Sequence, residues 1–475
     1  MKKFSFLVLL ITICFMLNVY SFTVDAETVS LKVYNWQDYI DDGTDDNGNI
    51  VSTPVIDMWI EDYKARTGIT VEVIYDTFET NETMLNTLKT GKSEYDLVCP
   101  SDYAIQKMIK DDMLEKFDTT KLPTYNKYGS PYLKELFEQN NWTEYSVPYM
   151  WGTVGLLYDP EVYSDELVSS WDIMWNKEYE NLATTKDSVR DTYFVGVMHV
   201  YQEELQDLRK QYLDGTITKE YYNKQVNIIM NRTDEDTLRL VEADLKIMKE
   251  NIFGLEVDSG KSDMVTGKIS MNLAWSGDAV YSMDLAEEED DKILAYSVPL
   301  EGSNVWYDGW VMPKGANVEL ATDFVDFLSK PEIAVLNMNK IGYTSAIAGE
   351  AVLEMIDDWY GAESEESAVE VDLTYFFGDT VECDEDGRVM VTVDEHYIGR
   401  QFSAQYPDYE TITRCGVMED FGDQNQAVLE MWANFKSNEL TPLTWATVIV
   451  LAVLALVWMV RSGIKQRNRR LHIRH

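Results

Sequence analysis

The 475-residue sequence contains only 4 Cys and 4 His, which restricts the chemistry that it can support. No pair among Cys99, Cys383 and Cys415 has the spacing of a metal site, and two of the histidines lie in the basic C-terminal tail. A metal or catalytic centre built on these residues is therefore not expected, and we expect no cofactor. A disulfide between Cys383 and Cys415 and a set of free thiols are both compatible with the sequence.

Basic residues are also scarce, because 40 Lys and Arg stand against 83 Asp and Glu, a formal net charge of -43. A nucleic-acid partner is not expected, since a phosphate backbone requires a basic face. The sequence lacks GxSxG, P-loop, HExxH and GxGxxG motifs, so an enzyme is not expected. The hydrophobic content of 45% and aromatic content of 12% are sufficient for a buried core, and the acidic charge favours a small cation as ligand.

Both ends of the chain carry segments typical of a membrane-associated protein. Lys2 and Lys3 precede an apolar run over residues 4–17, which predicts a signal peptide over 1–26, with an uncleaved anchor as the alternative. Residues 443–460 carry no charge and precede a basic stretch, which predicts a C-terminal transmembrane helix and a cytoplasmic tail over 461–475. This topology attaches the protein to the cell membrane and places residues 27–440 outside the cytoplasm.

Short strands alternate with short helices along the first half of the chain. Strands are predicted over 29–34, 69–75 and 95–98, and helices over 55–67, 81–89 and 104–110. The pattern restarts after Tyr145, with strands over 152–158 and 182–184 and helices over 170–175 and 191–201. This alternation predicts an α/β fold with two lobes, in which a ligand site forms at the carboxyl ends of the strands and between the lobes.

Three stretches read as insertions into this pattern. Residues 41–54 are acidic and turn-rich, and they match a calcium loop poorly because Pro54 falls at the twelfth ligand position. Residues 203–239 are highly charged and predict a helical hairpin broken near Gly215, and residues 383–393 predict a β-hairpin around Gly387.

Aromatic residues stand beside acids at the ends of several predicted strands. Examples are the segments NWQDY from Asn35, PSDY from Pro100, WSGD from Trp275 and WYD from Trp306. A polyamine is a flexible chain of methylenes with ammonium groups at fixed intervals, so its binding requires carboxylates for the charges and aromatic walls for the methylenes. The segments therefore favour a site for an organic cation.

Eight motifs follow one another in a recognisable order: YNWxxYI, YDLVxPSDY, VPYxWG, SWDxxW, DSVRD, WSGD, EGSxxWxD and IGY. This order, over residues 29 to 344, resembles the bacterial spermidine/putrescine-binding proteins, which are two-lobed solute-binding proteins of ABC transporters. The resemblance implies a periplasmic-binding-protein-like fold with a hinge, which captures spermidine or putrescine in an interlobe cleft and delivers it to ABC permease subunits. It implies a first lobe over 27–146 and 306–345, and a second lobe over 147–305 and 346–440, the last including a C-terminal extension.

The resemblance also implies a set of ligand-binding residues. Trp36 and Tyr39 would line the cleft, with Ser101 and Tyr103 adding polar contacts from the same lobe. Trp275 and Trp306 would sandwich the methylenes, and Asp308 and Asp191 would pair with ammoniums. Tyr343 would add a hydroxyl, and Asp278 would lie where putrescine-preferring relatives have an acid. Simple core packing is the alternative for the Trp residues, and a helix N-terminal acid is the alternative for Asp191. For the whole chain, a binding protein of the same fold for another solute, or a hydrolase using paired carboxylates, stays open.

Overall fold

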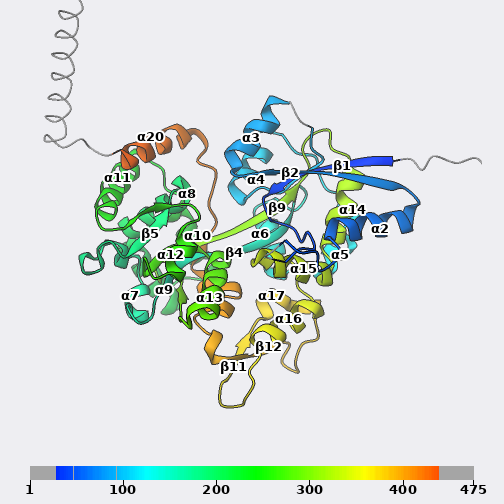
Figure 1. Cartoon of the computed structure of the whole chain (residues 1–475). Coiled ribbons are helices and arrows are strands. Elements are labelled where there is room, and N and C mark those ends of the chain that lie inside the picture. Colours follow the sequence, from blue (N-terminus) through cyan, green and yellow to red (C-terminus); the bar gives the residue numbers. More distant parts are fainter. Residues whose placement is uncertain (1–27, 46–47, 92–93, 438–475) are drawn as a thin grey trace, which may run out of the picture.

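The computed structural model describes residues 28–45, 48–91 and 94–437 (Figure 1). The predicted signal peptide over 1–26 lies outside the described residues. Figure 1 shows two groups of helices and strands that are joined by two long strands, β4 (Ser146–Tyr158) and β9 (Ser303–Val311). These two groups are called the first lobe, formed first by residues 28–139, and the second lobe, formed first by residues 165–290, and β4 and β9 are called the hinge strands.

One large sheet runs through both lobes in the order β2-β1-β3-β9-β4-β7-β5-β6. Strands β1 (Thr28–Trp36), β2 (Thr70–Phe78) and β3 (Leu97–Val98) are parallel and form the sheet of the first lobe. Strands β5 (Ala183–Lys186), β6 (Gly254–Glu256) and β7 (Met271–Trp275) are also parallel and form that of the second. β4 and β9 pair antiparallel between them, and every residue of both strands is buried.

The remaining strands are short. They are β8 (Ala295–Ser297), β10 (Thr344–Ser345), β11 (Ala368–Asp372), β12 (Met390–Asp394) and β13 (Cys415–Gly416). The helices of the first lobe and its return are α2 (Val55–Thr67), α3 (Asn81–Thr90), α4 (Asp102–Lys110), α5 (Pro123–Tyr128), α6 (Pro131–Gln139), α14 (Val318–Leu328) and α15 (Pro331–Ile341). Those of the second lobe are α7 (Asp165–Val168), α8 (Val189–Val200), α9 (Gln202–Leu213), α10 (Lys219–Met230), α11 (Glu235–Lys249), α12 (Gly260–Val265) and α13 (Ser276–Asp290). The last part of the chain forms α16 (Glu350–Tyr360), α17 (Thr374–Phe377), α18 (Gln401–Gln405), α19 (Tyr409–Thr413) and α20 (Asn425–Lys436).

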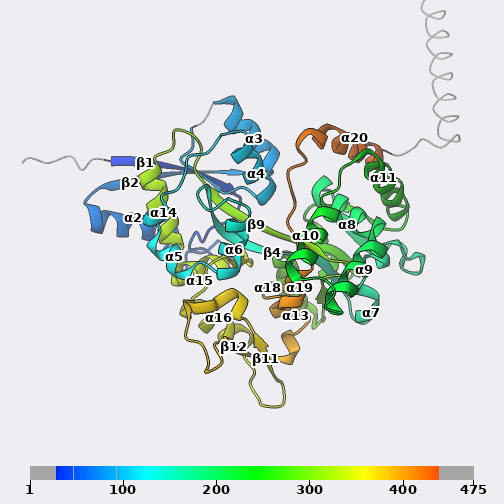
Figure 2. The same ribbon diagram turned by 180° about the vertical axis from the view of Figure 1, so that it is seen from behind.

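Chain segments that are distant in sequence return to each lobe. α14 and α15 lie in the first lobe beside α5 and α2, whereas α20 packs on α11 in the second lobe. Seen from behind, α16, β11 and β12 form a small unit below the hinge strands (Figure 2). Each lobe is therefore completed only by chain that has passed through the other one.

The fold prediction was right about the two α/β lobes and wrong about a C-terminal transmembrane helix. No helix within the part of the chain that the structure describes is long and apolar enough to cross a membrane. The predicted segment 443–460 itself lies outside the described residues.

Two further expectations are settled by the described residues. Cys99, Cys383 and Cys415 are all free, so the disulfide alternative was wrong. The hairpin predicted over 383–393 was placed incorrectly, because β12 pairs antiparallel with β11 (Ala368–Asp372) and α17 lies between the two strands. The turn around Gly387, whose φ is 76°, exists within that longer connection.

Candidate functional site

The carboxylate of Asp308 lies at the junction between the first lobe and the hinge strands. Its Oδ2 accepts a hydrogen bond of 2.7 Å from the hydroxyl of Tyr39, which follows β1. Ser101, at the start of α4, forms an isolated β-bridge with Asp308, and the influence of its side chain on the carboxylate lowers the pKa of Asp308. Burial raises the pKa of Asp308 to about 6 against the lowering effect of Ser101 and of the hydrogen bond from Tyr39. The other oxygen, Oδ1, is buried without a protein partner.

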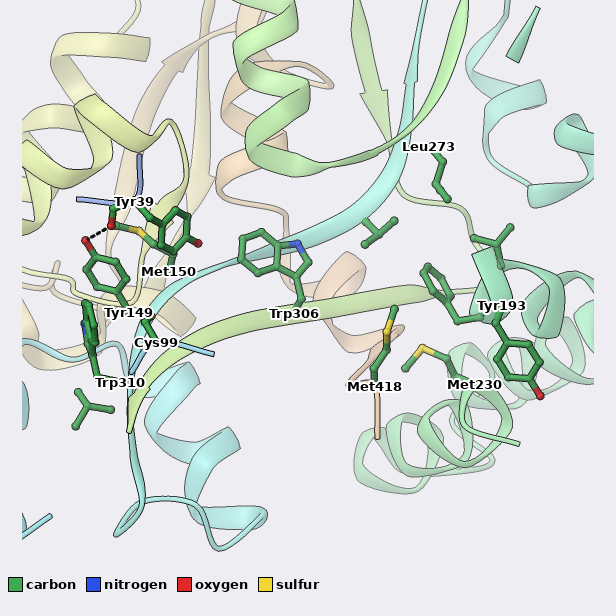
Figure 3. Packing of buried hydrophobic residues seen from close by; sticks show 14 of the residues in the cluster. Tyr39, Cys99, Tyr149, Met150, Tyr193, Met230, Leu273, Trp306, Trp310 and Met418 are labelled. Atoms are coloured by element: carbon green, nitrogen blue, oxygen red, sulfur yellow. Dashed lines mark hydrogen bonds between the residues drawn. The ribbon is translucent and has the colours of Figure 1, made fainter. Parts of the chain in front are cut away.

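Tyr343 connects this carboxylate to the second lobe. Its hydroxyl donates to Asp278 Oδ1 at 3.0 Å, and its ring centroid lies 6.0 Å from that of Tyr39 and 5.2 Å from that of Trp306. Figure 3 shows Trp306 projecting from β9 between groups of buried residues on either side. The Nε1 atom of Trp306 donates to the Thr153 carbonyl at 3.3 Å, which fixes the ring orientation.

A second carboxylate, Asp191, lies in the first turn of α8. Ser188 caps this helix by accepting from the Asp191 backbone N–H at 3.3 Å, so α8 begins where the chain leaves β5. Asp191 Oδ1 accepts from Trp275 Nε1 at 3.2 Å, and Trp275 ends β7. Burial raises the pKa of Asp191. The helix N-terminus and the indole N–H both stabilise the ionised form.

Eight of the ten residues predicted from sequence therefore lie together: six are joined by direct contacts, and the pair Asp191 and Trp275 is connected to them through a lysine. This set, called the interlobe cluster from here on, comprises Tyr39, Ser101, Asp191, Trp275, Asp278, Trp306, Asp308 and Tyr343. The link between Asp278 and Trp275 is made by a lysine, Lys186, which lies close to both.

The other two predicted residues have different partners. Trp36 packs on Phe78 with ring centroids 4.4 Å apart and is half-buried. Tyr103 accepts a hydrogen bond from Asn81 Nδ2 at 2.9 Å, and the guanidinium of Arg190 lies 3.9 Å from the centroid of its ring. Since Tyr103 is in the first lobe and Arg190 in the second, this contact connects the two lobes. It does not involve the carboxylates of the interlobe cluster.

Sequence reasoning missed the basic residues of the site. Lys186 ends β5, and Lys261 lies on α12 with its Nζ 3.7 Å from Asp278 Oδ1. Lys186 immediately precedes the DSVRD motif, so a charged residue at the end of a predicted strand was the available signal. Its partner Glu256 lies in β6, which the sequence pattern did not reveal.

The structure has two α/β lobes that share the antiparallel strands β4 and β9, with acids and aromatic rings between them. This architecture is typical of a solute-binding protein. The chain belongs to the bacterial extracellular solute-binding protein family, because the model of that family matches residues 58–362.

Several relatives are similar over most of their length. The spermidine/putrescine-binding periplasmic protein of Salmonella typhimurium is 28% identical over 67% of this chain and 78% of its own. The putrescine-binding periplasmic protein of Pseudomonas aeruginosa is 29% identical over 70% of this chain and 82% of its own. A spermidine/putrescine ABC transporter substrate-binding protein from Streptococcus pneumoniae has a TM-score of 0.55 at 26% identity, covering 86% of this chain and 98% of that structure. A spermidine/putrescine ABC transporter structure from Listeria monocytogenes has a TM-score of 0.58 at 25% identity, with the same coverage of 86% and 98%.

Proposed function

We propose that this protein captures a polyamine, spermidine or putrescine, between its lobes and delivers it to the permease subunits of an ABC importer. The observation that carries the proposal is the buried carboxylate of Asp308, with one oxygen free of protein partners. The ionised form of a buried carboxylate is costly unless its charge is matched, and an ammonium group matches it. The names of the relatives support the same ligand class.

The proposed roles follow from the positions of the side chains. Trp306 and Asp308 are two residues apart on β9, so their side chains lie on the same face of the sheet. An ammonium at Asp308 would therefore have its methylene chain beside the Trp306 ring. Asp191 would pair with the ammonium at the other end, next to the Trp275 indole, and Tyr39 and Ser101 would hold Asp308 in place. Trp36 and Tyr103 would contribute at the margin of the site in the first lobe.

Family membership and the predicted segment at the N-terminus together support a position outside the cytoplasm. The family is one of bacterial extracellular binding proteins. We propose residues 1–26 as the export signal. A binding protein in this position collects its solute outside the cell membrane and requires no catalytic group.

The proposal is tested by calorimetry on the purified full-length protein with putrescine and spermidine, with glucose, glutamate and sulfate as comparison solutes. At least one polyamine should bind, and the other solutes should not. Asp308→Asn should weaken polyamine binding by about 1.5–3 kcal/mol, the range for a hydrogen bond to a charged group. Asp236→Asn is the matched control, because it removes an acid whose side chain is 86% exposed on α11. Equal affinity of the Asp308→Asn variant and the wild type would remove Asp308 from the site.

A further inference from the structure

A lysine ammonium is built into the interlobe cluster. The side chain of Lys186 is only 1% exposed, and its Nζ lies 3.0 Å from Glu256 Oε1 and 3.7 Å from Asp278 Oδ2. The same Nζ lies 4.6 Å from the centroid of the Trp275 ring. A cation over an indole face, between two carboxylates, is the environment expected for an ammonium group of a bound polyamine. Here the protein supplies that ammonium itself.

Glu256 is arranged to hold Lys186, and both of its oxygens already have protein partners. Its Oε1 accepts from Asn272 Nδ2 at 3.0 Å as well as facing Lys186, and its Oε2 accepts from the Gly260 backbone N–H at 2.8 Å. The Glu256 side chain is 4% exposed. The lysine is therefore fixed in place by a carboxylate whose two oxygens are both engaged.

The carboxylates of the cluster fall into two kinds. Asp278 has a lysine near each oxygen, since Lys261 Nζ lies 3.7 Å from Oδ1 and Lys186 Nζ lies 3.7 Å from Oδ2. In contrast, no Lys or Arg nitrogen of the described residues lies within salt-bridge distance of Asp191 or Asp308. Asp191 and Asp308 are thus left without a salt bridge, although the charge of Lys186 opposes the rise in the pKa of Asp191 that burial causes, whereas Asp278 has two lysines beside it.

We infer that Lys186 acts as an internal ammonium group that makes the site selective for a linear diamine over a triamine. The inference rests on the proposed polyamine function and specifies the ligand class. A diamine such as putrescine places one ammonium at Asp308 and the other at Asp191. The third ammonium of spermidine would approach the position that Lys186 occupies, where like charges repel and Asp278 is already matched.

Calorimetric titration of the full-length protein with putrescine and with spermidine tests this inference. The wild type should bind putrescine at least tenfold more tightly. Lys186→Met should shift the ratio of the two dissociation constants at least tenfold toward spermidine, because a third ammonium can then pair with Asp278. Lys268→Met is the matched control: it removes a lysine that is 52% exposed and paired with Asp263, so the ratio should not change.

A second variant covers the case in which Lys186→Met does not fold, since that change leaves Glu256 buried without its cation. The double variant Lys186→Met/Glu256→Gln removes both charges of the pair and should show the same shift toward spermidine. Wild-type protein that binds spermidine as tightly as putrescine overturns the inference whatever the variants do, and so does an unchanged ratio in a folded variant. Wild-type protein that binds neither amine overturns the proposed function, and the inference with it.

Discussion

Gly277 and Tyr343 are in such close contact that the position of the tyrosine ring depends on the absence of a side chain at residue 277. A Cβ atom on Gly277 would lie 1.3 Å from Tyr343 Cδ1 and 1.8 Å from Cε1. Gly277 lies in the first turn of α13, directly before Asp278. Asp278 accepts a hydrogen bond from the Tyr343 hydroxyl. The glycine therefore permits the contact through which Tyr343 joins the two lobes.

Gly277→Ala should displace the Tyr343 ring and break its hydrogen bond to Asp278. We expect polyamine affinity to fall about tenfold, or ~1.4 kcal/mol, because the contacts of Tyr343 with Tyr39 and Trp306 are disturbed as well. Calorimetry measures the affinity, and circular dichroism should show an unchanged fold. Gly254→Ala is the control, since nothing lies within 4 Å of a Cβ at that position. Unaltered binding by Gly277→Ala would show that the Tyr343 position does not matter for the ligand.

The affinity for a polyamine should depend on pH through Asp308. Burial raises the pKa of this carboxyl to about 6 in the ligand-free protein, and only the ionised form attracts an ammonium group. Affinity should therefore fall as the pH decreases through about 6, and at pH 5 it should be about tenfold weaker than at pH 7.5. Calorimetry at the two pH values measures the difference. The Asp308→Asn variant should lack most of it, and a wild type with equal affinity at both pH values would contradict the assignment.

The same pKa shift has the opposite effect on the stability of the ligand-free protein. Because the folded state raises the pKa of Asp308 above its ordinary value of 3.8, the protonated form is favoured by folding. The stability contribution of this group is fully present below the unfolded pKa and is lost as the pH rises through about 6. As the pH rises, Asp308 thus increases the affinity for the ligand and decreases the stability of the ligand-free protein. The opposite signs distinguish a binding role of Asp308 from a structural one.

Arg190 holds the two lobes together through a sandwich of aromatic rings. Its guanidinium lies 3.9 Å from the centroid of the Tyr103 ring and 3.8 Å from that of Phe421, and its Nη1 donates to the Glu419 carbonyl at 2.8 Å. Arg190→Gln should weaken the closed arrangement by ~0.5–2 kcal/mol, the range of a cation–π contact, and should increase the dissociation rate of the ligand.

Stopped-flow measurement of ligand release tests the role of Arg190. We expect a rate increase of about 2- to 30-fold, which corresponds to the same free energies. Arg66→Gln is the control, because the ion pairs of Arg66 with Asp62 and Asp323 both lie within the first lobe. Release at the wild-type rate from Arg190→Gln would indicate that the sandwich does not hold the lobes closed.

Local sequence patterns predicted the elements whose boundaries depend on local chemistry. α2 spans Val55–Thr67 as expected, because Gly68 adopts a left-handed conformation with φ of 77° and ends the helix. The strands that carry Trp36 and Trp275 were also predictable, since each ends at a recognisable aromatic and acidic motif, whereas Asp308, expected at the end of a strand, lies within β9. For Trp275 and Asp308, a place in the interlobe cluster followed from the alternation of strands and helices and from the resemblance to known binding proteins, whereas Trp36 packs on Phe78 outside it.

Features that depend on distant pairing could not be predicted from the sequence. The partner of Lys186 is Glu256, which becomes a neighbour only because β5 and β6 are adjacent in the sheet. In the same way, the turn at Gly387 indicated a hairpin, but the strand that pairs with β12 lies before α17 and not directly before the turn. A local turn signal specifies a reversal of the chain and leaves the choice of partner strand to tertiary packing.

The position of β9 in the sheet determines the order in which the molecule can assemble. In space β9 lies between β3 and β4, yet in sequence it follows all the strands of the second lobe through β8. During synthesis from the N-terminus, the first lobe therefore has an open sheet edge at β3 until residues 303–311 emerge. The entropic cost of closing the intervening segment comes before any contact compensates it, and pairing between strands so far apart in sequence favours slow folding. The two lobes should consequently fold and unfold as one cooperative unit, although they look like separate bodies.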